Sequence, residues 1–159
     1  ASPADRNILT PKDFEGKIYS GWGTPLEEKF IRNLMEKTGG DFSKVEMRMM
    51  GATDFFGSME TEADFAWIYY GWDGIGAEVR NYPLNFILLQ DVDPNLDFYS
   101  PLFISNEKTI SEDPQTVKGF MRAVSKGYTY AVENVEESCD FLLKYTPETD
   151  RDHAIQIVQ

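Results

Sequence analysis

Cysteine and histidine are nearly absent from this 159-residue sequence, and their scarcity excludes several kinds of site. Cys139 is the only cysteine and lies in a helical pattern of apolar residues, so neither a disulfide framework nor a cysteine metal site is available. His153 is the only histidine and lies near the C-terminus, which removes most metal sites and most Ser-His-Asp arrangements. The two counts therefore argue against a metal site and against a histidine-based catalytic triad.

Long apolar runs and an excess of basic residues are also missing. The sequence has no run of about 18 apolar residues, so no membrane-spanning segment is expected. Residues 1–7 are polar and carry no secretory apolar region, so any targeting signal is absent or was removed. Lys and Arg number 15 against 27 Asp and Glu, and the resulting net charge of −12 argues against nucleic acid as a partner.

Aromatic residues, by contrast, are abundant, and they concentrate in residues 64–75, Asp-Phe-Ala-Trp-Ile-Tyr-Tyr-Gly-Trp-Asp-Gly-Ile. Their alternation predicts a strand that is buried on both faces of an α/β sheet and that ends at the first glycine. Trp67 and Tyr69 are therefore assigned to the core. Tyr70 and Trp72, nearer the carboxyl end where open α/β sheets bind ligands, are assigned to a pocket, with core packing as the alternative.

Three units of the sequence share one layout, in which a strand is followed by a glycine and then by the start of a helix. The glycines are Gly23, Gly51 and Gly71, after strands predicted at 17–22, 45–50 and 64–70. After the first of them, Thr24, Pro25 and Glu27 have the spacing of a helix capping box. If the strands are parallel, their carboxyl ends converge, and glycines and helix-start amides can approach one ligand. The layout is common in α/β proteins, so by itself it leaves a binding role open.

The rest of the chain divides into a polar start, two further apolar runs and a helical tail. Residues 1–15 are polar and are interpreted as a linker before the first strand. The apolar runs at 83–92 and 98–105 are interpreted as extended segments. Periodic apolar residues in the tail predict three helices, at 113–131, 136–145 and 148–158.

Several segments of the chain resemble a known family. Residues 21–28, Gly-Trp-Gly-Thr-Pro-Leu-Glu-Glu, are similar to its first ligand-side loop, and residues 64–72 are similar to its aromatic strand. Three later segments are also similar: residues 98–101, 106–110 and 127–131. The family is that of the substrate-binding proteins of ABC importers for thiamine pyrimidine precursors, related to those for sulfonates and nitrate. The resemblance covers nearly the whole chain from Thr10 onward.

The resemblance implies an α/β, type II periplasmic-binding-protein (Venus-flytrap) fold, with two lobes and a ligand cleft between them. Residues 16–98 would form the second lobe, and residues 99–159 would be a C-terminal helical segment that returns to the first lobe. The first lobe's half of the cleft is expected to be missing from this sequence, as in a fragment. The resemblance also implies an ABC permease as partner and an extracytoplasmic location, while unpartnered tail helices favour a homo-oligomer.

The function implied is that of a non-enzymatic solute-binding component of an ABC importer, with an aminopyrimidine in the cleft. The resemblance thus implies no catalytic residue, no cofactor and no metal ion. Aromatic walls would stack on the flat ring, and backbone amides with a few polar side chains would bind its edge. The candidate ligand-binding residues are Trp22, Gly23, Thr24, Thr53, Asp54, Tyr70, Trp72 and Asp73. Trp22 and Trp72 are the candidates for stacking, whereas Glu27 is assigned to the helix cap.

Other functions stay open at this point. The solute could be a riboflavin-like heterocycle, a sulfonate or nitrate. A pyridoxal-phosphate-dependent pyrimidine synthase is less favoured, because such chemistry needs a positioned lysine, a histidine and a phosphate site, and His153 lies in the tail. A sensor or interaction domain that reuses the same lobe is the third alternative.

Overall fold

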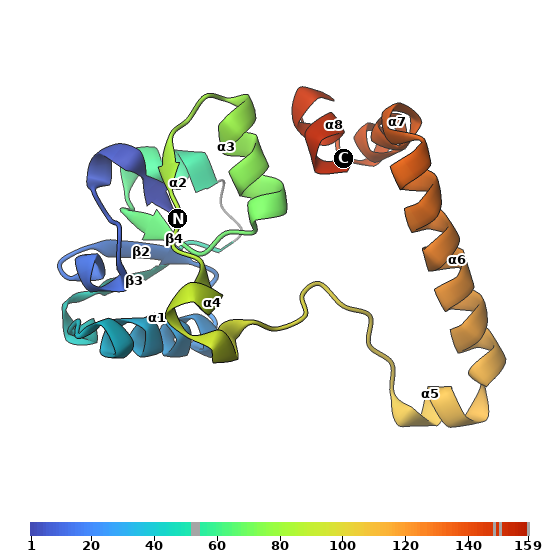
Figure 1. The fold of residues 1–159 in the computed structure, drawn as a ribbon, viewed down its shortest axis with the longest axis horizontal. Helices are drawn as coiled ribbons and strands as arrows, with labels where there is room; N and C mark the ends of the chain where they lie inside the picture. The colour runs from blue at the N-terminus through green and yellow to red at the C-terminus, as the bar shows by residue number, and fades with distance from the viewer. Residues whose placement is uncertain (52–54, 148, 150, 159) are drawn as a thin grey trace. The chain divides into compact units, whose positions relative to one another are not determined.

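The chain is a mixed α/β protein that forms two units, Ala1–Phe98 and Tyr99–Gln159 (Figure 1). The computed structural model describes residues 1–51, 55–147, 149 and 151–158. The predicted α/β class is thus confirmed. The first unit contains all the strands of the described residues, and the second contains only helices and irregular segments.

The first unit is built around a parallel three-stranded sheet. Its central strand is β2 (Ile18–Gly21), which lies between β3 (Glu46–Met49) and β4 (Phe65–Ala66). Both pairings are parallel, so the carboxyl ends of all three strands meet at one edge of the sheet. This arrangement confirms the predicted convergence of the strand ends, and it is the edge at which open α/β sheets bind ligands.

Helix α1 (Pro25–Thr38) begins and ends where the sequence predicts. Its capping box is complete, because the Thr24 side chain accepts a hydrogen bond from the Glu27 amide and the Glu27 carboxylate accepts one from the Thr24 amide. It ends at Gly39, whose φ of 74° favours glycine. Among the described residues, the other α-helices of this unit are α2 (Phe55–Thr61), α3 (Ile75–Val79) and α4 (Leu89–Val92).

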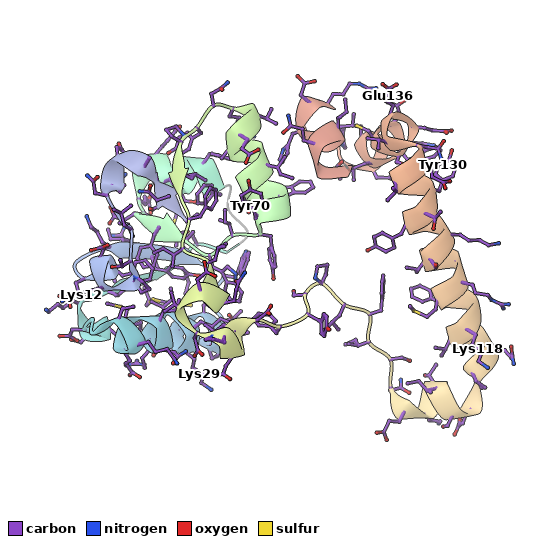
Figure 2. The ribbon with its side chains drawn as sticks, viewed as in Figure 1. Lys12, Lys29, Tyr70, Lys118, Tyr130 and Glu136 are labelled. Atoms are coloured by element: carbon purple, nitrogen blue, oxygen red, sulfur yellow. The ribbon has the colours of Figure 1, made fainter. Side chains whose placement is uncertain are left out.

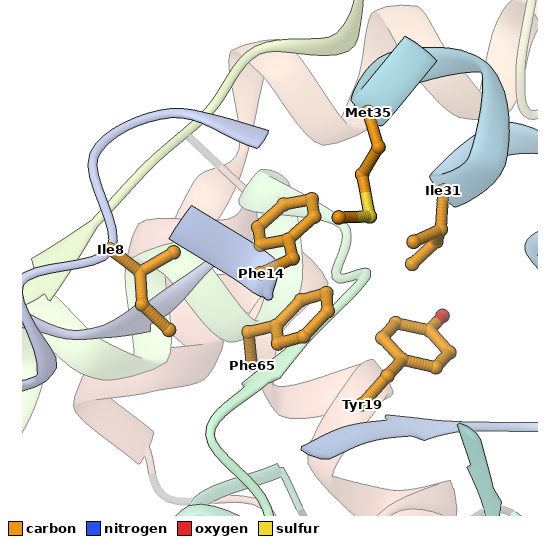
Figure 3. Close-up of a cluster of buried hydrophobic side chains, with 6 residues drawn as sticks. All are labelled: Ile8, Phe14, Tyr19, Ile31, Met35 and Phe65. Carbon is orange, nitrogen blue, oxygen red and sulfur yellow. The ribbon is translucent and has the colours of Figure 1, made fainter. Parts of the chain in front are cut away.

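Two apolar clusters cover the two faces of the sheet. The first consists of Ile8, Phe14, Tyr19, Ile31, Met35 and Phe65 (Figure 3). Within it, the rings of Phe14 and Phe65 stack with centroids 4.0 Å apart and an angle of 7° between their planes. The second consists of Phe55, Phe56, Met59, Ala63, Ala66 and Ala77. Because Phe65 and Ala66 are consecutive residues of β4, their side chains point to opposite faces and belong to different clusters.

The interpretation of residues 1–15 as a linker is wrong, because these residues form part of the first unit. β1 (Ser2–Pro3) pairs antiparallel with β5 (Leu84–Asn85). Ile8 and Phe14 are buried in the first cluster, with only 1% and 5% of their surface exposed. The segment is polar on average, but it carries two apolar side chains at the positions that contact the core, and average polarity does not reveal them.

The aromatic segment also departs from its predicted form. β4 ends at Ala66, and Tyr70–Gly74 forms a π-helical turn that leads into α3, where the sequence predicts a strand up to the glycine. Tyr69 was assigned to the core but is 47% exposed. The reason is that the alternation of a strand no longer applies beyond Ala66. Residues 98–105, predicted as extended, lie in no strand, and part of the run at 83–92 forms α4.

The second unit consists of α5 (Glu107–Glu112), α6 (Pro114–Glu133), α7 (Val135–Tyr145) and α8 (Arg151–Val158). The three predicted tail helices are confirmed. Cys139 of α7 and Ala154 of α8 are fully buried where these two helices pack together. None of the residues of α6 is buried, and its apolar stripe includes the exposed Phe120 and Tyr128. Within the described parts of the chain, no helix is both long and apolar enough to cross a membrane.

Asp93 holds the segment after α4 against α1 through a hydrogen bond and an ion pair. Its carboxylate accepts a hydrogen bond of 2.7 Å from the Asn33 side chain and lies 3.3 Å from the Lys37 ammonium, both on α1. It also accepts a hydrogen bond from the Asn95 amide, and the residue is 4% exposed. These partners, led by Asn33, lower the pKa of Asp93 from 3.8 to about 2. The segment that precedes Phe98 is therefore held against α1 by a charged group.

We expect Asp93→Asn to weaken the dependence of folding stability on pH at the acidic end. The depressed pKa means that the carboxylate stabilises the fold above its ordinary pKa of 3.8, and that this contribution disappears as the pH falls towards about 2. Urea unfolding at pH 7, 4, 3 and 2.5 measures the slope, with Asp91→Asn, an exposed carboxylate two residues earlier, as control. Equal slopes for Asp93→Asn and the parent would contradict this account.

Candidate functional site

Three aromatic rings gather at the carboxyl edge of the sheet. Trp22 follows β2 directly, and Trp67 and Tyr69 follow β4. The Trp22 and Tyr69 rings have centroids 6.2 Å apart and planes inclined by 29°, and Trp67 lies 6.3 Å from Trp22 and 6.4 Å from Tyr69. We call Trp22, Trp67 and Tyr69 the aromatic edge. It joins residues that are 45 to 47 positions apart in the sequence only because the two strands are parallel neighbours.

The members of the aromatic edge differ in how they are packed. Trp67 is half-buried and contacts Phe30 of α1, with ring centroids 5.2 Å apart, and Phe30 in turn contacts Phe98 at 5.9 Å. Trp22 and Tyr69 are 45% and 47% exposed. Trp67 thus serves as the packed base of the aromatic edge. Trp22 and Tyr69 keep ring surface open to solvent, where a planar molecule can stack on it.

The loop between β2 and α1 brings the backbone close to the same edge. Gly23 has a φ of 81°, which favours glycine, and a Cβ atom at this position would lie 2.5 Å from the Met49 Sδ atom. Any other residue would therefore be strained there and would displace the methionine. Met49 is the last residue of β3 and is 78% exposed, and its side chain lies beside Gly23 in this loop. The structure thus places Gly23 next to Trp22 of the aromatic edge, with Met49 as an additional neighbour.

Glu27 lies beneath the loop and is 1% exposed. Its carboxylate accepts hydrogen bonds from the Tyr19 hydroxyl, the Trp22 amide, the Thr24 amide and the Thr24 hydroxyl. Burial alone would raise the pKa of Glu27, but the hydrogen bonds from Thr24, Tyr19 and Trp22 outweigh it and hold the pKa below its ordinary value. Tyr19 is also buried, and its burial, together with its hydrogen bond to the Glu27 carboxylate, raises the pKa of the Tyr19 hydroxyl. A negative charge is therefore fixed under the loop.

Thr24 was predicted to offer a donor to the ligand, and the structure gives both its donors another partner. Its amide and its hydroxyl each lie 2.7 Å from the Glu27 Oε2 atom. Thr24 therefore shapes the loop rather than presenting a donor. Thr53 and Asp54, also predicted as ligand-binding residues, lie outside the described residues.

The remaining predicted residues lie on the π-helical turn after the aromatic edge. Tyr70, labelled in Figure 2, is 50% exposed, its ring packs edge-on against Phe86 at 5.2 Å, and its hydroxyl donates to the Glu78 carboxylate. Trp72 is 42% exposed, and Asp73 is half-buried. No ring contact joins Trp22 to Trp72, both of which are described. The structure thus pairs Trp22 with Tyr69 and Trp67 instead of with its predicted partner.

The match to a family of known proteins extends over most of the chain. The family model described as NMT1/THI5 like matches residues 1–138, which include the whole first unit and helix α6. The chain belongs to the NMT1/THI5-like family. This result confirms the resemblance found from residues 21–28 and 64–72, since both segments lie within the match.

A curated relative of this NMT1/THI5-like chain is the formylaminopyrimidine-binding protein of Halalkalibacterium halodurans (strain C-125). The two are 26% identical over 155 residues, which is 92% of this chain and 44% of the relative. The chain therefore spans less than half the length of the curated relative that it matches.

Across the described residues, no group of three or more His, Cys, Asp or Glu side chains is placed to hold a metal ion.

Sequence reasoning missed Tyr69 and Met49 as members of the site. In the predicted strand, Tyr69 points to the same face as Trp67, and the sequence therefore assigns both rings to the core. Met49 ends a strand whose apolar residues gave no sign of which side chain would reach the edge. The parallel register of β2 against β3 and β4, in which Tyr19 faces Met47 and Phe65, is the observation that places both residues.

Proposed function

We propose that this chain supplies one wall of a binding site for a pyrimidine-precursor solute, and that the ligand stacks on the aromatic edge. The observation that carries the proposal is the pair of exposed rings of Trp22 and Tyr69, inclined by only 29°, at the carboxyl edge of a parallel sheet. Such an edge is where open α/β folds hold ligands, and flat heterocycles stack on aromatic rings. Membership of the family and the pyrimidine-binding role named for the relative support this class of solute.

The charges around the aromatic edge favour a neutral ligand over an anion. The first turn of α1 is where a helix offers its amides to an anion, and the Glu27 carboxylate already occupies that position. A sulfonate or nitrate would meet this buried negative charge without a basic partner among the site residues. A flat heterocycle needs ring surface and room to approach the backbone, which Trp22, Tyr69 and Gly23 provide. A riboflavin-like ring is the second candidate on the same observation.

We also propose, from membership of the family, how this chain fits into a whole binding protein. The first unit would be the second lobe of a Venus-flytrap fold, and the other wall of the cleft would come from residues outside this chain. A two-lobe protein that contains this chain would deliver its solute to an ABC permease outside the cytoplasm and would perform no chemistry of its own. The exposed apolar stripe on α6 favours self-association of the chain as it stands.

We expect the 159-residue chain to bind a formylaminopyrimidine with a dissociation constant in the millimolar range. Losing about half the contacts of a micromolar site costs roughly 4 kcal/mol, which is about a thousandfold in affinity. Titration followed by NMR measures such weak binding, with riboflavin, a sulfonate and nitrate as competing ligands. Preferential binding of the sulfonate or nitrate would overturn the heterocycle proposal, and submicromolar binding of any of them would show that one wall is enough. A new absorbance band with pyridoxal phosphate would favour the enzyme alternative.

A further inference from the structure

The loop that carries Trp22 has an unusual support. An ordinary capping box joins the first helical turn to the residue before it, here Glu27 to Thr24. In this chain the same carboxylate reaches two further donors: the Trp22 amide at 2.9 Å and the Tyr19 hydroxyl at 2.8 Å. Oε1 accepts these two, and Oε2 accepts the Thr24 amide and hydroxyl. One buried side chain therefore joins the strand, the loop and the helix.

The space for this carboxylate is built into the strand. A Cβ atom on Gly21 would lie 2.3 Å from the Glu27 Oε1 atom and equally close to the Tyr19 ring. Only glycine therefore leaves room for the carboxylate under the loop. Tyr19 is itself immobilised, since it is 1% exposed and packs against Phe65 with ring centroids 5.3 Å apart. The hydroxyl that donates to Glu27 is thus held by the core of the unit.

We propose that Glu27 is the positioning residue of the ligand site: its four-way hydrogen bonding fixes the Trp22 backbone, and with it the indole, on the aromatic edge. The inference rests on the proposed function, because it gives Glu27 its effect through the stacking ring. Its own atoms do not touch the ligand, since the residue is 1% exposed. The role depends on a group that only accepts hydrogen bonds, because all four partners are donors.

Glutamine at position 27 tests the acceptor requirement without changing the size of the side chain. Its amide nitrogen would face either the Trp22 amide or the Thr24 amide, neither of which can accept, so one of these two hydrogen bonds is lost. The other amide keeps only a neutral oxygen, which accepts more weakly than a carboxylate does. Tyr19→Phe removes one donor and keeps the ring, and so tests the link to the core. Glu28→Gln is the matched control: it is the next residue of the same helix, removes the same charge, and is exposed in an ion pair with Arg32.

The experiment measures amide hydrogen exchange at Trp22 and Thr24 in the ligand-free 159-residue chain, and the initial slope of an NMR titration with a formylaminopyrimidine. We expect Glu27→Gln to speed exchange at both amides and to weaken binding, each at least tenfold, while circular dichroism shows that the fold is retained. Tyr19→Phe should cause smaller changes in the same direction. Glu28→Gln should change neither quantity.

The two measurements separate the failure of this inference from the failure of the proposed function. Faster exchange with unchanged binding in Glu27→Gln would overturn the positioning role and leave Glu27 as a helix cap only. Unchanged exchange at Trp22 would overturn it as well. If the parent chain binds no heterocycle, the proposed function fails, and the exchange data still decide whether Glu27 holds the loop. If Glu27→Gln does not fold, Tyr19→Phe decides, and unchanged exchange and binding in that variant would overturn the inference.

Discussion

Replacing Phe14 with alanine should lower the free energy of unfolding of the first unit by about 3–5 kcal/mol. The Phe14 ring is 5% exposed and stacks directly on Phe65, with centroids 4.0 Å apart, inside the cluster of Figure 3. Its loss would leave a cavity between the N-terminal segment and β4, in addition to the lost burial of the ring. Since whole domains are stable by only about 5–15 kcal/mol, this change removes a large share of the total.

Urea unfolding followed by tryptophan fluorescence measures this effect. The signal reports on the first unit, because Trp22, Trp67 and Trp72 all lie in it and are the only tryptophans of the chain. Leu9→Ala is the matched control, since Leu9 lies in the same segment but is 65% exposed, and surface changes of this kind stay within about 0.5 kcal/mol. Phe14→Ala as stable as Leu9→Ala would mean that residues 1–15 behave as the linker that their composition suggests.

Replacing Trp22 or Tyr69 with alanine should weaken binding of a formylaminopyrimidine about tenfold or more. Stacking contributes about 0.5–1.5 kcal/mol beyond the burial of area, and the buried area adds about 25 cal/mol per Å², so the total exceeds the roughly 1.4 kcal/mol that correspond to a factor of ten. Both rings are nearly half exposed, so both variants should stay folded. The titration by NMR gives the affinity, and circular dichroism gives the folding.

Trp72→Ala is the informative comparison for the ligand site. The sequence predicts Trp72 as the stacking partner of Trp22, whereas the structure places Tyr69 beside Trp22, 6.2 Å away. We therefore expect Trp72→Ala to weaken binding less than Tyr69→Ala does. The reverse order would restore the pocket predicted from the sequence. Parent-like binding by both Trp22→Ala and Tyr69→Ala would show that the aromatic edge is not the ligand surface.

The features predicted correctly from the sequence depend on contacts between near neighbours in the chain. Thr24, Pro25 and Glu27 lie within one helical turn, so their spacing is enough to locate the start of α1. The apolar period of the tail likewise locates α6, because a helix repeats every 3.6 residues whatever it packs against. The wrong predictions concern contacts across the fold. Ile8 and Phe14 are buried because Phe65 lies beside them, about 50 residues later in the chain, and no local pattern reports that.

The same distinction explains the candidate site. The sequence places Gly23 and Trp22 at the end of a strand because a glycine after a strand is a local signal with a physical reason, and the structure has them there. Tyr69 was misplaced because β4 ends after two residues, and the π-helical turn from Tyr70 onward interrupts the alternation of side chains. Predicting that break requires knowing how α3 packs. The pairing of Trp22 with Tyr69 additionally requires the register of β2 against β4.

The single cysteine makes it possible to follow the second unit separately from the first. The Cys139 Sγ atom is fully enclosed between α7 and α8, 3.9 Å from the Arg151 carbonyl oxygen. A thiol reagent can react with it only when these two helices separate, so the rate of labelling measures how readily α7 and α8 open. Indole emission reports on the first unit, which holds all three tryptophans. The unmodified protein thus carries one chemical reporter for each unit, and the folding of the two can be followed separately in a single sample.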